Sequence, residues 1–249
     1  MKKFQLLLLF CCFVSSMGLA QKQFRALLFT KTNGFHHESI HDGVTAVKEL
    51  ADRHVFDVEW HEDPGRFTDN NLARYDVIIF LNTTGDILNE SQQAAMEKFI
   101  RAGKGFVGVH SASDTEYEWE WYTKMVGRMF KIHPPTQTAQ LRFTTNKFPG
   151  LELFRESNPW TDEWYEFGPE KTTGLNYILA VDENTYNTKV QWGQNKGEGM
   201  GFHPVAWYHE YDGGRAFYTA LGHVPAVYRD PAFLNHLYAG IYYAAKGKK

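Results

Sequence analysis

Short apolar runs alternate with amphipathic stretches through the first half of the chain, and this alternation limits the folds that it can adopt. Residues 75–81 (YDVIIFL) form a continuous apolar run, which is typical of a strand covered on both faces. The pattern predicts strands at 24–30, 54–60, 75–81 and 105–110, and helices at 39–53 and 90–102. This β-α-β alternation predicts an α/β fold with a mostly parallel sheet and helices on both of its faces.

The second half adds further strands to this pattern. The expected elements are strands at 137–144, 177–181, 205–211 and 215–221, and a closing helix at 231–245. We find neither an internal repeat nor a linker, and the length of the chain suits one well-buried domain. We therefore expect a single domain over residues 21–249, with extra strands in its second half.

The first twenty residues have the pattern of a secretory leader. Lys2 and Lys3 precede an apolar run at 6–14, and small residues at 18–20 resemble a cleavage site. The apolar run is too short to span a bilayer core of about 30 Å. We expect residues 1–20 to be a cleaved signal peptide and the product to be periplasmic or secreted, with a lipoprotein as the alternative.

Cleavage after Ala20 would remove both cysteines, Cys11 and Cys12. The mature chain would then have no disulfide, no thiolate metal ligand and no cysteine nucleophile. Loss of Lys2 and Lys3 changes the formal charge from −3 to −5, with 24 basic against 29 acidic residues. No basic run or basic amphipathic helix is visible in the sequence. This argues against a nucleic-acid partner and against membrane contact beyond export.

Three loops are expected to meet at one edge of the sheet. Ligands of open α/β sheets bind at the carboxyl ends of the strands, and residues 30–37, 82–86 and 110–114 follow such ends. Residues 108–112 (GVHSA) resemble the strand-to-helix elbow that presents a nucleophile in α/β enzymes, with His110 in the nucleophile position. An imidazole there can be a general acid or base, or a metal ligand.

Other histidines also lie in predicted loops or at strand ends, and metal binding is the class of function that they suggest first. His223, for example, follows a glycine at the end of a predicted strand, much as His110 ends another. The candidates for catalysis, or for binding a divalent metal ion, are His37, His110, His133 and His223.

Residues 37–41 (HESIH) match the H-E-x-x-H pattern of zinc peptidases, which places both histidines on one face of a helix. Here Ser39 and Asp42 resemble a capping pair that starts a helix. His37 would then precede the helix, and the match would be coincidental. A metallopeptidase is kept as a minor alternative.

Polar and aromatic residues around the expected crevice are candidates for substrate binding. Residues 162–166 (DEWYE) combine acidic and aromatic side chains, and aromatic faces stack on the C–H-rich faces of sugars. If this stretch is extended, Glu163 and Tyr165 share one face. The substrate-binding candidates are Asn82, Thr84, Asp86, Glu163, Tyr165, His203 and Trp207.

Five stretches of the chain carry a resemblance to a known family. They are 34–40 (GFHHESI), 81–86 (LNTTGD), 108–112 (GVHSA), 203–207 (HPVAW) and 214–223 (GRAFYTALGH). Together they resemble the ThuA-like (trehalose utilisation) family over nearly the whole mature chain. The family pattern has an arginine where this chain has His36, which favours His37 for the shared role.

The resemblance implies a flavodoxin-like, class I glutamine-amidotransferase-like fold that lacks the amidotransferase cysteine. It also implies a role in bacterial sugar catabolism, beside dehydrogenases of the glucose–fructose oxidoreductase type that make 3-keto-sugars. We expect an exported carbohydrate-processing enzyme that acts on keto-glycosides or trehalose-like disaccharide derivatives. Histidine acid/base chemistry would carry out an isomerisation, an elimination or a hydrolysis.

Two other functions stay open. A non-catalytic periplasmic sugar-binding module would bind a sugar without forming a product, and a metal-dependent hydrolase would lose activity to a chelator. The expected partners are a small-molecule sugar, a dehydrogenase of the type named above, and a second copy of the chain in a homodimer.

Overall fold

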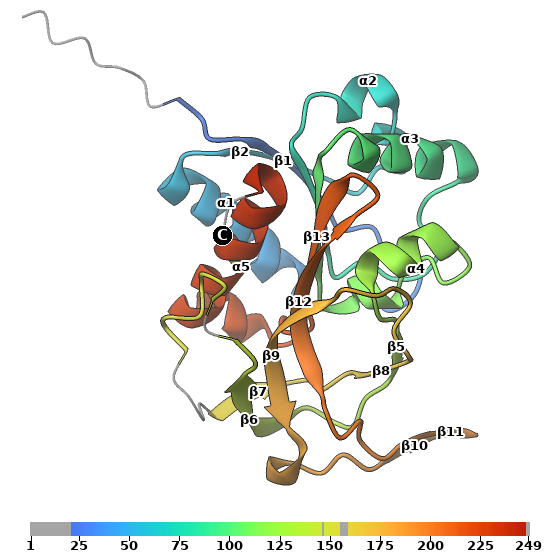
Figure 1. The fold of residues 1–249 in the computed structure, drawn as a ribbon, viewed down its shortest axis with the longest axis vertical. Helices are drawn as coiled ribbons and strands as arrows, with labels where there is room; N and C mark the ends of the chain where they lie inside the picture. Colours follow the sequence, from blue (N-terminus) through green and yellow to red (C-terminus); the bar gives the residue numbers. More distant parts are fainter. Residues whose placement is uncertain (1–20, 146, 155–158, 248–249) are drawn as a thin grey trace, which may run out of the picture.

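A nine-stranded mixed sheet runs through the molecule, with helices on both of its faces (Figure 1). The computed structural model describes residues 21–145, 147–154 and 159–247, so the predicted signal peptide at 1–20 lies outside the described residues. Within these ranges, no helix is both long enough and apolar enough to cross a membrane. The α/β fold class predicted from the sequence is confirmed.

Five strands form the parallel half of the sheet. In spatial order they are β2 (Asp57–His61), β1 (Arg25–Phe29), β3 (Val77–Leu81), β4 (Gly105–Val109) and β13 (Gly214–Thr219). This order is that of flavodoxin-like sheets, in which ligands bind where the chain crosses from the first strand to the third. Every residue of β3 and β4 is buried, which explains why both read as continuous apolar runs.

Four antiparallel strands extend the sheet beyond β13. They are β12 (Pro204–Tyr211), β9 (Asn176–Asp182), β6 (Gln137–Phe143) and β7 (Pro159–Asp162). Two small antiparallel pairs stand apart: β5 (Phe130–Ile132) with β8 (Glu166–Phe167), and β10 (Val190–Trp192) with β11 (Asn195–Gly197). The sequence did not predict β7 or these short pairs, because two to four residues are too few to establish a period.

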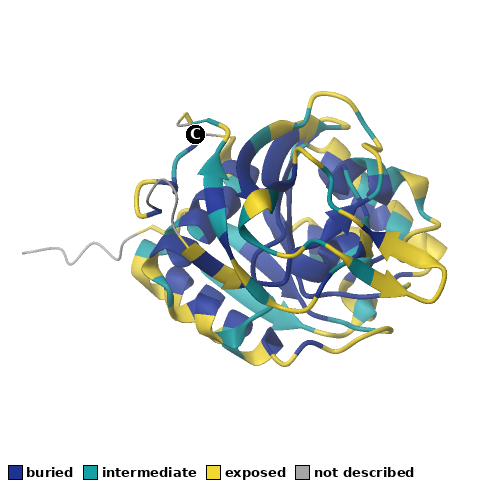
Figure 2. Cartoon of the chain, turned by 90° about the horizontal axis from the view of Figure 1, so that it is seen from below, coloured by how far each residue is buried: buried dark blue, intermediate teal, exposed yellow. Residues whose placement is uncertain are grey.

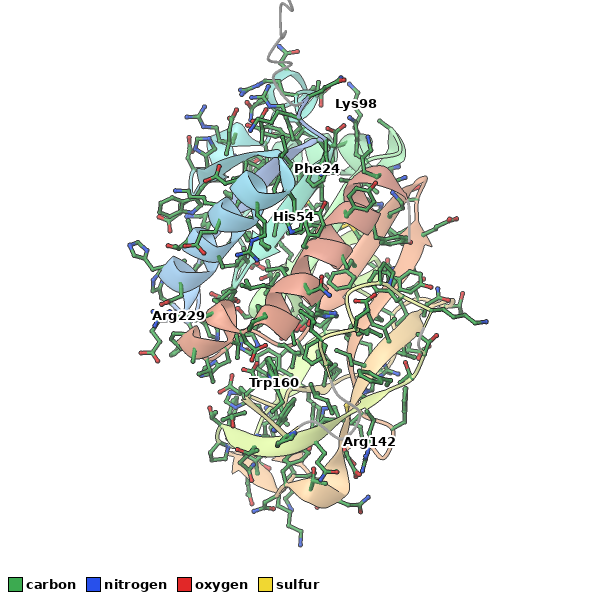
Figure 3. All side chains as sticks on the ribbon, turned by 90° about the vertical axis from the view of Figure 1, so that its left-hand side faces the viewer. Phe24, His54, Lys98, Arg142, Trp160 and Arg229 are labelled. Carbon is green, nitrogen blue, oxygen red and sulfur yellow. The ribbon has the colours of Figure 1, made fainter. Side chains whose placement is uncertain are left out.

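The helices cover both faces of the sheet (Figure 1). One face carries α1 (Ile40–His54) and α5 (Pro231–Lys246), and the other carries α2 (Asp69–Leu72), α3 (Glu90–Arg101) and α4 (Glu120–Val126). Short 3-10 helices lie at Pro64–Arg66, His110–Asp114, Glu183–Thr185 and Pro225–Arg229. Figure 3 shows α1 and α5 side by side, and the His54 ring stacks on Tyr238 of α5 with 3.5 Å between ring centroids.

The core follows the strands and the inner faces of the helices (Figure 2). Phe80 of β3 lies at its centre, with its ring centroid 5.5 Å from Phe29 of β1 and 5.4 Å from Phe106 of β4. Tyr122 of α4 packs on the same ring at 5.8 Å. This aromatic packing joins three parallel strands to a helix, and so fixes the strand ends from which the site is built.

Candidate functional site

His110 occupies a backbone elbow directly after β4. Its φ is 49°, a left-handed conformation that costs free energy in a residue with a side chain. Tyr218 Oη donates a hydrogen bond of 2.7 Å to the carbonyl of His110 and so helps to hold it. Gly108 permits the close approach, since a Cβ there would lie 3.0 Å from the Tyr218 ring and 3.2 Å from Ala112 Cβ. The elbow predicted from the sequence is therefore present, and its imidazole is fully buried.

The surroundings of His110 define which ring nitrogen carries a proton. Nδ1 lies 2.8 Å from the carbonyl oxygen of Ala220, which can only accept a hydrogen bond. Nδ1 is therefore the protonated nitrogen, and Nε2 of the neutral ring has a free lone pair. This Nε2 lies 3.3 Å from Nδ1 of His223 and 3.5 Å from Oε2 of Glu163. It can take up a proton or bind a metal ion.

Glu163 is the carboxylate of this cluster, and its two oxygens contact three histidines. Oε1 lies 3.0 Å from Nδ1 of His133, and Oε2 lies 3.1 Å from Nδ1 of His223. Burial disfavours the charged carboxylate, but its contacts with His110 and His223 outweigh this effect and lower the pKa of Glu163. Burial likewise opposes a charge on His223, yet its hydrogen bond to Glu163 raises the pKa of His223.

His37 reaches the same cluster from the loop after β1. Its ring lies edge to face with His110 at 4.9 Å and with His223 at 5.3 Å. Burial, followed by the neighbouring His110 and His223, lowers the pKa of His37 to about 2, so the ring is neutral at physiological pH. His36 is exposed and instead lies 3.2 Å from Thr32 Oγ1.

The predicted meeting of the loops after β1, β3 and β4 is present, with isolated bridges between Thr32 and Thr84 and between Gly85 and Thr115. The loop after β13, which carries His223, joins them.

The residues at the start of α1 are arranged differently from the predicted capping pair. Ser39 is the N-cap, but its side chain makes no capping hydrogen bond. Its Oγ instead donates to the carbonyl of Gly222 at 3.1 Å and accepts from Asn82 Nδ2 at 2.8 Å. His37 precedes the helix and His41 lies exposed on its first turn. The two histidines of the zinc-peptidase pattern thus do not form a pair.

Four side chains of the cluster could together hold a metal ion. His37, His110, Glu163 and His223 each offer a ligand atom, and these atoms all lie within 4.8 Å of one another. Three imidazoles and one carboxylate suit zinc or another first-row divalent cation. The Nδ1–H of His110 donates to a backbone carbonyl, the outer hydrogen bond that usually orients a metal-binding histidine. His133 contacts Glu163 but stands outside this set of four.

Tyr165 lies against the cluster, as expected for a residue of its wall. Its ring centroid is 4.2 Å from that of His110 and 5.5 Å from that of His133. Burial raises the pKa of Tyr165 well above its usual value, so the phenol stays protonated. Of the seven predicted substrate-binding residues, Glu163 and Tyr165 are the two that the structure places in contact with the histidines.

The three candidates after β3 make their contacts outside the histidine cluster. Asn82 is fully buried and bonds to Ser39, as described above. Thr84 is also buried, and its Oγ1 donates to the carbonyl of Phe35 at 2.9 Å, which braces the loop that carries His37. Asp86 is exposed. In this structure Asn82 and Thr84 connect backbone segments, and we do not include these three residues in the proposed site.

The two candidates on and before β12 are also removed from the cluster. His203 is buried, with Nδ1 2.8 Å from Oε1 of Glu183 and Nε2 2.8 Å from the carbonyl of Tyr165. Trp207 is fully buried, and its Nε1 donates to the carbonyl of Val126 at 2.7 Å. The polar atoms of both side chains are bonded to groups outside the four cluster residues, so we do not include them in the proposed site. The sequence indicates which face of a strand a residue occupies, but not how deeply the next layer covers that face.

Asp162 is an important residue that the sequence interpretation did not single out. It is fully buried, and its carboxylate accepts the backbone N–H groups of Gly222 at 2.9 Å and of His223 at 3.0 Å. It also accepts the N–H of Glu163 at 3.0 Å. Burial raises the pKa of Asp162. Its position beside Glu163 in an acidic, aromatic stretch was the available signal, but the partners are backbone atoms and leave no sequence pattern.

The ThuA family model, described as trehalose utilisation, matches residues 25–244. The chain therefore belongs to the ThuA family, and this membership supports a carbohydrate-related role. No curated protein matches the chain by sequence.

Solved structures share the fold. A ThuA-like protein from Bacteroides uniformis is similar with a TM-score of 0.77 and 19% identity, over 92% of this chain and 94% of that one. A ThuA-like protein from Parabacteroides merdae has a TM-score of 0.71 and 19% identity, over 91% of each chain. A β-galactosidase from Bacillus circulans sp. alkalophilus has a TM-score of 0.53 and 15% identity, over 87% of this chain and 30% of its own. At these identities the likeness concerns the fold alone.

Proposed function

We propose that this chain is an exported carbohydrate-processing enzyme that removes a proton from a carbon next to the ketone of a keto-glycoside. The observation that carries the proposal is the meeting of His37, His110, His223 and Glu163 at the carboxyl end of the parallel sheet. A ketone acidifies the neighbouring C–H bonds, so the reaction needs a base and a group that stabilises the enediolate oxygen. The leader pattern of residues 1–20 supports export.

Two imidazoles of the site are suited to accept that proton. Nδ1 of His110 donates to the carbonyl of Ala220, and Nδ1 of His133 lies 2.9 Å from the carbonyl of Pro134. Each neutral ring therefore has a free lone pair on Nε2. Burial lowers the pKa of His133, which favours its neutral form. We assign the base to His110, and to His133 if His110 is occupied as a metal ligand.

The proton then has two destinations. When it leaves carbon, the C–H electron pair moves onto the ketone oxygen and forms the enediolate. In an isomerisation, the proton returns to the former carbonyl carbon, the neighbouring hydroxyl loses its proton to become the new ketone, and the former ketone oxygen is protonated. In an elimination, the enediolate re-forms the ketone, its electron pair breaks the bond to the glycosidic oxygen, and that oxygen takes up a proton. His223 is suited to donate its own proton to the departing glycosidic oxygen, because its hydrogen bond to Glu163 raises the pKa of the ring. The base keeps the proton taken from carbon until the product leaves.

A metal-dependent hydrolase is the second candidate function, and the set of three histidines and one carboxylate favours it. Catalytic zinc sites use ligands of this kind. When bound, a divalent cation would act as a Lewis acid on a carbonyl oxygen or would activate water. His133 would remain available as a base, since it lies outside the four donors.

The test is NMR of the purified protein with 3-keto-disaccharides and with their unoxidised parents in D₂O. We expect deuterium incorporation, or a new sugar, from the keto substrates alone. We also expect this signal to disappear in His110→Gln and to persist in His209→Gln, a buried histidine on β12 whose Nε2 bonds to the carbonyl of Met125. Hydrolysis of the parents that a chelator stops would favour the hydrolase instead. Binding without any product would contradict both enzymatic proposals and support a sugar-binding module.

A further inference from the structure

We propose that Trp192 forms a second sugar subsite, on which the disaccharide ring that does not carry the ketone stacks. This inference rests on the proposed carbohydrate function, and it extends the site from the reacting ring to its neighbour. It is carried by the placement of exposed aromatic side chains relative to the histidine cluster.

Two exposed aromatic side chains, Phe35 and Trp192, lie beside histidines of the site. In the part of the chain that the structure describes, the exposed large hydrophobic residues are Phe35, Tyr117, Leu153, Trp192 and Phe202. Two of them contact histidines of the site edge to face: Phe35 lies 4.8 Å from His37, and Trp192 lies 4.6 Å from His133, between ring centroids. Aromatic surface left open to water beside polar groups is typical of a sugar site, because it can stack on the C–H face of a pyranose.

Of these two rings, that of Trp192 is the more firmly held by its neighbours while still open to a ligand. Phe35 is 66% exposed on a loop, whereas Trp192 is 44% exposed and also lies 6.2 Å from the ring of Phe130. One imidazole, that of His133, separates Trp192 from the carboxylate of Glu163. A sugar ring stacked on Trp192 would therefore be the immediate neighbour of a ring held at the cluster.

The hairpin that carries Trp192 is fixed to the site at its base. A two-stranded hairpin is marginally stable alone, and Figure 1 shows β10 and β11 projecting away from the main sheet. The buried carboxylate of Glu166, three residues after Glu163, accepts the N–H of Gly199 at 2.7 Å. Gly197 allows this approach, since a Cβ there would lie 2.7 Å from Glu166 Oε1. The hairpin, and with it the Trp192 ring, is thus held in place before a ligand binds, which lowers the entropy cost of binding.

The experiment compares a keto-disaccharide with the corresponding methyl keto-glycoside, which lacks the second ring. For Trp192→Ala we expect KM for the disaccharide to rise about three- to tenfold, the range of one aromatic stacking contact. We expect kcat for the disaccharide, and both constants for the methyl glycoside, to change less than about twofold. Trp192→Phe should restore part of the loss. Phe202→Ala is the matched control, because Phe202 is 51% exposed and packs on Tyr177.

Binding of the unoxidised disaccharide, followed by isothermal titration, separates this inference from the proposed chemistry. Weaker binding in Trp192→Ala, with no turnover in any variant, would support the subsite and contradict the proposed reaction. A different result would overturn the subsite and leave the reaction standing: both substrates are turned over, and the ratio of the disaccharide KM to the methyl glycoside KM is the same in the wild type and in Trp192→Ala. An equal loss for both substrates would also overturn it, since the second ring would then play no part.

Discussion

The carboxylate of Asp162 accepts the backbone N–H of His223, with 3.0 Å between Oδ1 and N. The same carboxylate accepts the N–H of Gly222 and of Glu163. One buried side chain therefore holds both the loop that presents His223 and the first residue after β7. Glu163 and His223, whose carboxylate and imidazole lie 3.1 Å apart, are therefore positioned by a common anchor.

We expect Asp162→Asn to show that Asp162 positions Glu163 and His223, in addition to its contribution to the stability of the fold. The amide keeps one acceptor oxygen and loses the other, so stability should fall by about 1–3 kcal/mol, the usual cost of weakened hydrogen bonds to a buried charge. The kcat should fall at least about tenfold with KM nearly unchanged, because the reacting groups shift while the binding surface stays. Denaturant unfolding and steady-state kinetics measure the two effects. Asp52→Asn, at an exposed position of α1, is the control, and an unchanged kcat in Asp162→Asn would contradict the positioning role.

The left-handed backbone of His110 should be detectable without any assay of activity. His110→Gly and His110→Ala both remove the imidazole, but only glycine adopts a φ of 49° without steric cost. We expect the glycine variant to be more stable than the alanine variant by about 1 kcal/mol in urea unfolding. Equal stability, or greater stability of the alanine variant, would show that the elbow is unstrained.

Metal content should depend on the four cluster donors and not on His133. We expect the protein, equilibrated with zinc and then dialysed, to retain about one ion per chain by plasma mass spectrometry, as the four-donor geometry suggests. Glu163→Gln and His223→Gln should lose it, while His133→Gln should keep it, because His133 lies outside the set. Retention by Glu163→Gln and His223→Gln would place any bound metal elsewhere.

His236 gives a prediction for acid stability away from the site. It is fully buried, and burial lowers its pKa to about 3. The unfolded chain therefore binds a proton near the ordinary pKa of 6.5, whereas the folded chain binds it only near pH 3. Because the unfolded state binds more protons between these values, the free energy of unfolding falls as the pH drops from 6.5 to about 3. The slope from this one group is at most about 1.4 kcal/mol per pH unit. His236→Gln should show a shallower decline in urea unfolding between pH 6.5 and pH 4, and a decline as steep as that of the wild type would contradict this account.

The parallel half of the sheet could be predicted because β1, β3 and β4 are mainly apolar runs and amphipathic helices lie between the strands. The elbow at His110 followed from Gly108 and the strand before it, and the meeting of His37 with His110 followed from the common edge of parallel strands. Asp162 could not be predicted, since it binds backbone N–H groups of a segment sixty residues away. Trp207 was a substrate-binding candidate from the sequence, and the structure places it fully buried with its Nε1 bonded to the carbonyl of Val126.

The four donor side chains come from chain positions 37, 110, 163 and 223. The last of them follows β13, which pairs with β4 inside the sheet and is among the last strands to be synthesised. A growing chain therefore cannot bring these four donors together until nearly all of its sequence has left the ribosome and β13 has joined the sheet. Any truncated product that lacks the final quarter would also lack His223, so the four donors come together only in the finished molecule.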